Sequence, residues 1–138
     1  MDQEALVGAI VGARAQIDFV WQFFVSAQLA VFALLVIYDE VVEDLNVIAK
    51  GLVLVAMGTF DWINAGALIE SYLMLDALHD QFRVSFGSLP NLSRLFVARF
   101  VNVSYESGPT TVMFTHSLAF TTVLLAIIWR SFIRRRPR

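Results

Sequence analysis

Two carboxylic acids lie in a stretch of sequence that is otherwise apolar enough to cross a membrane. Asp61 and Glu70 both fall within residues 51–75. A charge in hydrocarbon is costly, so such acids usually face a bundle interior or a water-filled cavity, and they often mark an ion or proton path. Each residue turns a helix by about 100°, which puts these two acids on opposite helix faces. We expect one acid to face the bundle and the other a neighbouring subunit.

Further polar residues are expected at the depths of these acids. A rise of about 1.5 Å per residue places Glu70 and His116 both roughly 8–9 Å from one membrane surface. We predict two polar layers that together form a discontinuous ion or proton path. One is made by Gln22, Ser26, Glu70 and His116, and a deeper one by Asp61 and Asn64, with Gln28, Thr121 and Thr122 at a similar depth. The alternative for each acid is a protonated carboxyl in a structural hydrogen bond between helices. For His116 the alternative is an ordinary hydrogen-bonded histidine.

Small and weakly polar residues recur along one face of each apolar stretch. Such residues let membrane helices approach closely and form hydrogen bonds with one another. The positions predicted to pack helices are Gly58, Ala65, Thr115, Ala119 and Thr122.

The chemistry available for catalysis is sparse. The chain has no cysteine and two histidines, which excludes thiolate metal sites and cysteine nucleophiles. No nucleophile–base pair or metal-ligand cluster is evident from the spacing of the remaining residues. We therefore predict no catalytic residue, no metal and no cofactor, and a protein that is not an enzyme.

The composition indicates how these residues are positioned. The chain is 58% hydrophobic and 16% charged, whereas soluble domains average about 25% charged residues. Three stretches reach the roughly 20 residues that cross about 30 Å of hydrocarbon, at about 19–38, 51–75 and 110–132. The prediction is an all-α integral membrane protein with three transmembrane helices, forming a single membrane domain over residues 1–138.

The long connection at 76–109 is expected to hold a fourth helix. It breaks at Gly87–Ser88–Leu89–Pro90, and an apolar-to-basic stripe with helical spacing follows over residues 91–105. We predict an amphipathic helix there, lying in the membrane interface. A short strand or a packed loop is the alternative.

Lysine and arginine counts predict the orientation. The side with the N-terminus and the long connection carries four of these bases, and the other side carries six. Because the cytoplasmic side is the more basic one, we predict N-out, C-in, in a plasma or bacterial inner membrane. The tail cluster is also expected to meet anionic lipid rather than nucleic acid. It consists of Arg130, Arg134, Arg135, Arg136 and Arg138.

The leading functional hypothesis is a homo-oligomeric membrane channel or translocation subunit for a cation or a proton. It follows from two intramembrane acids on a chain whose three helices are too few to enclose a path alone. A non-catalytic accessory subunit of a larger membrane complex is the second hypothesis. A phage-type lysis protein is the third.

Overall fold

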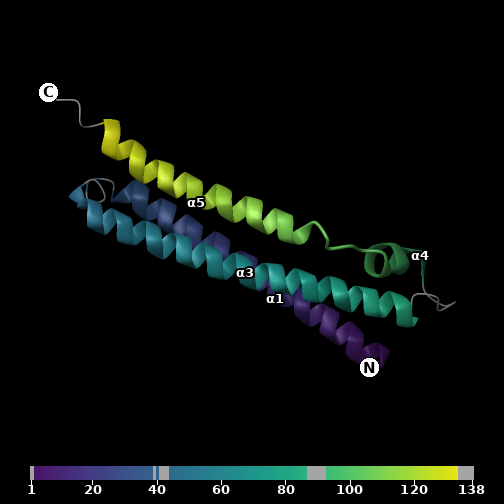
Figure 1. Ribbon diagram of the computed structural model, residues 1–138. Helices are drawn as coiled ribbons and strands as arrows, with labels where there is room; N and C mark the ends of the chain where they lie inside the picture. Colours follow the sequence, from purple (N-terminus) through teal and green to yellow (C-terminus); the bar gives the residue numbers. More distant parts are fainter. Residues whose placement is uncertain (1, 39, 41–43, 87–92, 134–138) are drawn as a thin grey trace. The chain divides into compact units, whose positions relative to one another are not determined.

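The computed structural model describes residues 2–38, 40, 44–86 and 93–133, with the backbone alone for 130–133 (Figure 1). The described residues are helical and contain no strand, which confirms the predicted all-α class. In chain order the elements are α1 (Gln3–Ile37), α3 (Val47–Phe86), α4 (Arg94–Phe96), the π-helical turn η1 (Val97–Val101) and α5 (Gly108–Ile133). The arginines at 134–136 and 138 and the side chain of Arg130 lie outside the described part.

Local polar residues fix where the helices begin. The Asp2 carboxylate accepts a hydrogen bond from the backbone N–H of Ala5, at 2.8 Å, at the start of α1. Asn46 caps α3 in the same way through the N–H of Ala49, also at 2.8 Å. These contacts satisfy N–H groups that have no partner inside a helix.

Three of the described helices, α1, α3 and α5, are long and apolar enough to cross a membrane. This confirms the three predicted spans by length and composition. α3 has 40 residues, so it is about 60 Å long, roughly twice the thickness of the hydrocarbon. Its apolar stretch at 51–75 can therefore span while its last turns, from Asp76 to Phe86, extend beyond.

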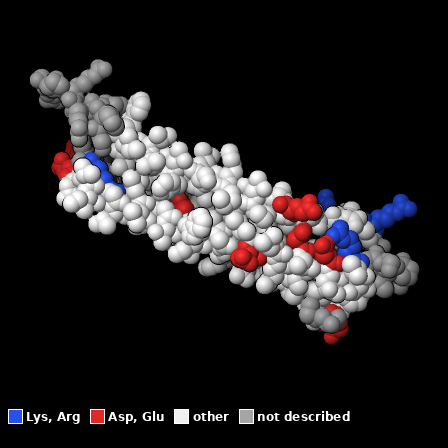
Figure 2. Space-filling model, in the orientation of Figure 1, with Lys and Arg blue, Asp and Glu red and all other residues white. Residues whose placement is uncertain are grey.

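The chain forms two compact units, and α1, α3 and α5 each have residues in both. Unit 1 contains Met1–Trp21 and Gly66–Val112, and unit 2 contains Gln22–Ala65 and Met113–Arg138. Figure 2 shows red and blue side chains gathered over unit 1 and a mostly white surface over the helices of unit 2. The units therefore differ in surface chemistry, and each is described by itself.

Unit 1 has an aliphatic and aromatic core. Its buried apolar side chains come from α1, α3, η1 and α5, and they include Leu6, Ile10, Leu68, Leu75, Phe82, Val101 and Val112. Burial of the first turns of α1 ties the N-terminal residues to this core. Gly108 is required at the start of α5, because a Cβ there would lie 2.6 Å from the ring of Tyr72.

Unit 2 has a smaller apolar core and an apolar surface. Leu35, Val123 and Ile127 are buried together, with Phe32 and Leu54 packed against them. Many large apolar side chains of this unit point outward, among them Phe23, Leu29, Val55 and Leu125. An outward apolar surface is what a lipid-facing helix requires.

The connection between α3 and α5 departs from its prediction. An amphipathic helix is predicted over 91–105, of which residues 91 and 92 lie outside the described part. The described helical residues are 94–101, and five of these eight form the π-helical turn η1. The aromatic side chains of this segment pack on α3: Phe96 and Phe100 lie with ring centroids 6.3 Å and 5.4 Å from that of Phe82. The expected apolar face is thus largely used inside unit 1.

Candidate functional site

A buried acid–amide pair joins α1 and α3 within unit 2. Gln28 Nε2 donates a hydrogen bond of 2.7 Å to Asp61 Oδ1. Both side chains are deeply buried, with 6% of Gln28 and 5% of Asp61 exposed. Asp61 Oδ2 and Gln28 Oε1 have no hydrogen-bond partner. A buried acceptor without a donor is costly, so the second carboxylate oxygen is chemically available.

A second buried pair joins α3 and α5 in the same unit. His116 Nε2 lies 2.9 Å from Asn64 Oδ1, and 4% of His116 is exposed. An amide oxygen can only accept, so Nε2 carries the proton in this arrangement. The His116 ring also stacks on Phe24 of α1, with centroids 3.9 Å apart. Asn64 follows Asp61 by one helical turn, so α3 presents both polar side chains on one face.

Asp61 and His116 line one groove between α3 and α5. The groove has a volume of about 220 Å³, and its walls include Gly58, Trp62, Met113 and Phe120. Gly58 leaves room for the Phe120 ring, which would lie 3.3 Å from a Cβ at that position. A carboxyl group and an imidazole within one apolar groove can take up protons or a cation and exchange them.

The first predicted polar layer does not assemble as expected. Gln22, Ser26 and Glu70 are exposed, whereas His116 is buried against Asn64. Glu70 belongs to unit 1, where it lines a groove of about 490 Å³ with Gln16 and other residues of α1 and α3. The reason is rotational: side chains at one depth still point around the helix in different directions.

The deeper predicted layer comes together in part, because Gln28, predicted at the depth of Asp61, contacts it. Asp61 and Asn64 are both buried on α3, and Gln28 supplies the hydrogen bond to the acid. The sequence indicates that Gln28 lies at a depth similar to that of Asp61. It does not indicate that the two side chains face each other, because this depends on how the helices are rotated.

The predicted packing residues fall into two groups. Ala65 is buried and Gly58, Thr115 and Ala119 are half-buried, but Thr122 is exposed. The fully buried face of α5 is instead displaced by one residue, to Val112, His116, Val123 and Ile127. Thr122 Oγ1 donates to the carbonyl of Leu118, at 2.7 Å, and so needs no second helix.

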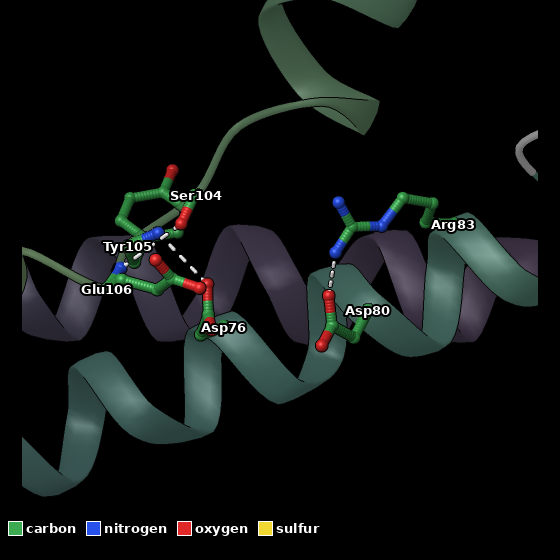
Figure 3. A network of polar contacts seen from close by, with 6 residues as sticks. All are labelled: Asp76, Asp80, Arg83, Ser104, Tyr105 and Glu106. Carbon is green, nitrogen blue, oxygen red and sulfur yellow. Dashed lines mark hydrogen bonds and ion pairs between the residues drawn. The ribbon is translucent and has the colours of Figure 1, made fainter.

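Unit 1 holds a polar and aromatic cluster that the sequence did not reveal. Asp76 accepts a hydrogen bond of 2.9 Å from the N–H of Tyr105, close to the ion pair of Arg83 with Asp80 on α3 (Figure 3). Arg14 of α1 donates to the Tyr105 hydroxyl. Trp21 of α1 donates from Nε1 to the Tyr72 hydroxyl, at 3.0 Å. These contacts hold the end of the long connection on α1 and α3.

His79 is the unexpected member of this cluster. Only 1% of it is exposed, and neither ring nitrogen has a partner in good hydrogen-bond geometry, although the nearby Phe100 backbone favours the protonated ring. Its ring lies 5.2 Å from the rings of both Phe100 and Tyr105, measured between centroids. Burial, followed by the nearby charge of Arg14, lowers the pKa of His79 below its ordinary value. His79 lies beyond the apolar stretch of α3, in the part that the sequence places outside the membrane.

Among the described residues, no three His, Asp or Glu side chains come together to hold a metal ion. The chain matches no family model, no curated protein and no solved structure. The site is therefore interpreted from its own chemistry.

Proposed function

We propose that the protein is a homo-oligomeric membrane subunit that translocates a proton or a small cation, with Asp61 and His116 as the groups that carry it. The supporting observation is Asp61 itself, a buried acid that lines a groove with His116 while one carboxylate oxygen has no partner. A carboxylate in hydrocarbon is stabilised by taking up a proton or a cation, which makes it a natural relay.

The stretches that can cross a membrane leave Asp61 as their central charge. The predicted spans at 19–38, 51–75 and 110–132 contain three charged side chains, Asp61, Glu70 and Arg130, and Asp61 lies farthest from the ends of its span. His116 lies on the facing helix, and Asn64 orients its ring through a hydrogen bond. Histidine and carboxyl groups exchange protons readily near neutral pH when their surroundings adjust their affinities.

Oligomer formation completes the proposal. Three helices pack around a core of side chains such as Leu35 and Val123, so a path for ions would run between copies. The groove of Asp61 opens between α3 and α5, where the exposed Trp62 is available to a neighbour. The predicted N-out, C-in orientation and the membrane type remain predictions.

Proton flux tests this function directly. The full chain, purified into liposomes, is expected to carry protons down an imposed potential, read by a trapped pH-sensitive dye. Asp61→Asn keeps the shape and can keep a hydrogen bond to Gln28, but it cannot take up a proton, so we expect flux to fall about tenfold or more. The matched control is Asp18→Asn, an exposed acid of unit 1. Equal flux in both variants, or none in the native protein, would refute proton translocation.

A non-catalytic accessory subunit is the second candidate, and one observation favours it. The pairs Gln28–Asp61 and Asn64–His116 are both formed within one chain, so a purely structural role, in which they hold the helices together, also accounts for them. Native mass spectrometry in nanodiscs separates the two candidates. A discrete homo-oligomer supports the translocation subunit, whereas a stoichiometric complex with another polypeptide supports the accessory role.

A further inference from the structure

The groove of unit 2 places a carboxyl group and an imidazole within a largely apolar surface. Asp61 and His116 lie among aromatic and aliphatic walls, and Trp62 at the edge is 76% exposed. The volume of about 220 Å³ is below the roughly 300–1,000 Å³ of typical drug-sized sites. The groove thus suits a small, mainly apolar molecule.

The two carboxylate oxygens of Asp61 are not equivalent. Oδ1 accepts from Gln28, at 2.7 Å, whereas Oδ2 has no partner although it is buried. His116 Nε2 is already directed to Asn64. What the groove lacks is a hydrogen-bond donor for Oδ2, preferably one with a positive charge that offsets the carboxylate.

We propose that this groove binds a small hydrophobic amine in its ammonium form, with Asp61 Oδ2 accepting a hydrogen bond from the ammonium group. The proposal rests on the proposed function, in which Asp61 takes up a proton or a cation. The rings of Trp62 and Phe120, which line the same groove, suit the cation and its apolar substituent.

The carboxyl group of Asp61 favours an ammonium ion over a lipid chain or a bare metal cation as the molecule in the groove. A lipid chain fills an apolar groove but leaves Oδ2 without a donor. A bare metal cation requires several oxygen ligands, and Asp61 is the one acid among the groove residues. When the carboxyl group is protonated, ammonium binding releases that proton, so that one positive charge replaces another. Amine and proton are thereby alternative occupants of one group.

The test uses phenethylamine and its uncharged counterpart 2-phenylethanol, titrated into the full-length protein in nanodiscs. Binding is followed by calorimetry and by tryptophan fluorescence, with Trp62→Phe assigning the signal to the groove. We expect phenethylamine to bind about tenfold or more tightly than the alcohol, because a hydrogen bond to a charged group is worth more than one between neutral groups. Asp61→Asn should remove this preference, and Asp18→Asn should retain it.

Three outcomes would overturn the proposal. Equal affinity for the amine and the alcohol would mean that the groove takes apolar molecules only. A preference for the amine that survives Asp61→Asn would place the site elsewhere. A partner helix that co-purifies and occupies the groove would exclude a small ligand. Proton flux without amine is measured separately, so that loss of amine binding with flux intact refutes this inference alone.

Discussion

Each of the two units buries one histidine, and the units do so in different ways. In unit 2, His116 is 4% exposed and bonds to Asn64 of another helix. In unit 1, His79 is 1% exposed, and both ring nitrogens lack a partner. The two buried imidazole rings therefore have different environments. His116 is hydrogen-bonded within the apolar unit 2, whereas His79 is surrounded by aromatic rings within the charged unit 1.

The surroundings explain the difference. A membrane-spanning unit has no water to satisfy a polar atom, so the partner must come from the protein. Unit 1 carries many charged residues, among them Arg14, Asp76 and Arg83, and the tilted rings of Phe100 and Tyr105 exclude water from His79 locally. The lowered pKa of His79 favours its neutral form.

The largest expected effect is a difference in the free-energy cost of truncating a buried leucine in the core of each unit. Leu6→Ala in unit 1 should cost about 2–5 kcal/mol, because it deletes a fully buried side chain that water would otherwise surround. Leu35→Ala in unit 2 should cost less, since lipid is as apolar as leucine and packing alone is lost. Hydrogen exchange in nanodiscs measures the local opening free energy of each unit. Equal costs would show that both cores are stabilised by the same force.

The next effect contrasts the histidine partners. Asn64→Leu leaves His116 buried without its hydrogen bond, and we expect unit 2 to lose about 1–3 kcal/mol. His79→Leu removes a ring with no partner, and unit 1 should keep its stability or gain slightly. Thermal unfolding in detergent measures the stability of both variants, and amide hydrogen exchange around residues 64 and 79 locates the change. A loss of stability in His79→Leu as large as that in Asn64→Leu would contradict the contrast.

The smallest effect is a pH dependence confined to unit 1. The pKa of His79 is lowered in the folded state by burial and by the charge of Arg14, and the backbone of Phe100 and the charge of Asp76 only partly oppose this. The unfolded chain therefore binds the proton more tightly. The stabilising effect is complete above the ordinary pKa of about 6.5 and is lost as the pH falls below it toward the folded-state value.

Exchange of the amides in η1 and up to Tyr105 measures this dependence, after correction for the intrinsic pH dependence of exchange. We expect opening of this segment to increase below about pH 6.5 in the native protein. His79→Leu should remove the dependence. A response that persists in the variant would assign it to another group, such as Asp76 beside it.

The sequence predicted the features that depend on composition and periodicity. Apolar length specified the three long helices, because a chain crossing hydrocarbon must satisfy its backbone internally. α3 continues as a helix past residue 75 to Phe86. The amphipathic helix is predicted too long, because the helical segment ends with the π-helical turn at Val101. Its aromatic side chain Phe100 packs on Phe82.

The site could be predicted only in part. Asp61 and Asn64 share a face of α3 because they are one turn apart, and that spacing is written in the sequence. The partners Gln28 and His116 lie on other helices, and their contacts depend on how each helix is rotated about its axis. A displacement by one residue turned the buried face of α5 toward Val123 and left Thr122 exposed.

The sequence by itself thus determined that three apolar helices exist, that Asp61 is the charge at their centre and that Glu70 lies on the other side of its helix. Only the tertiary structure decided which polar groups meet, which carboxylate oxygen of Asp61 is left over, and that His79 is enclosed by aromatic rings. The physical reason is that length and period are properties of one helix, whereas rotation, contact and burial arise between helices.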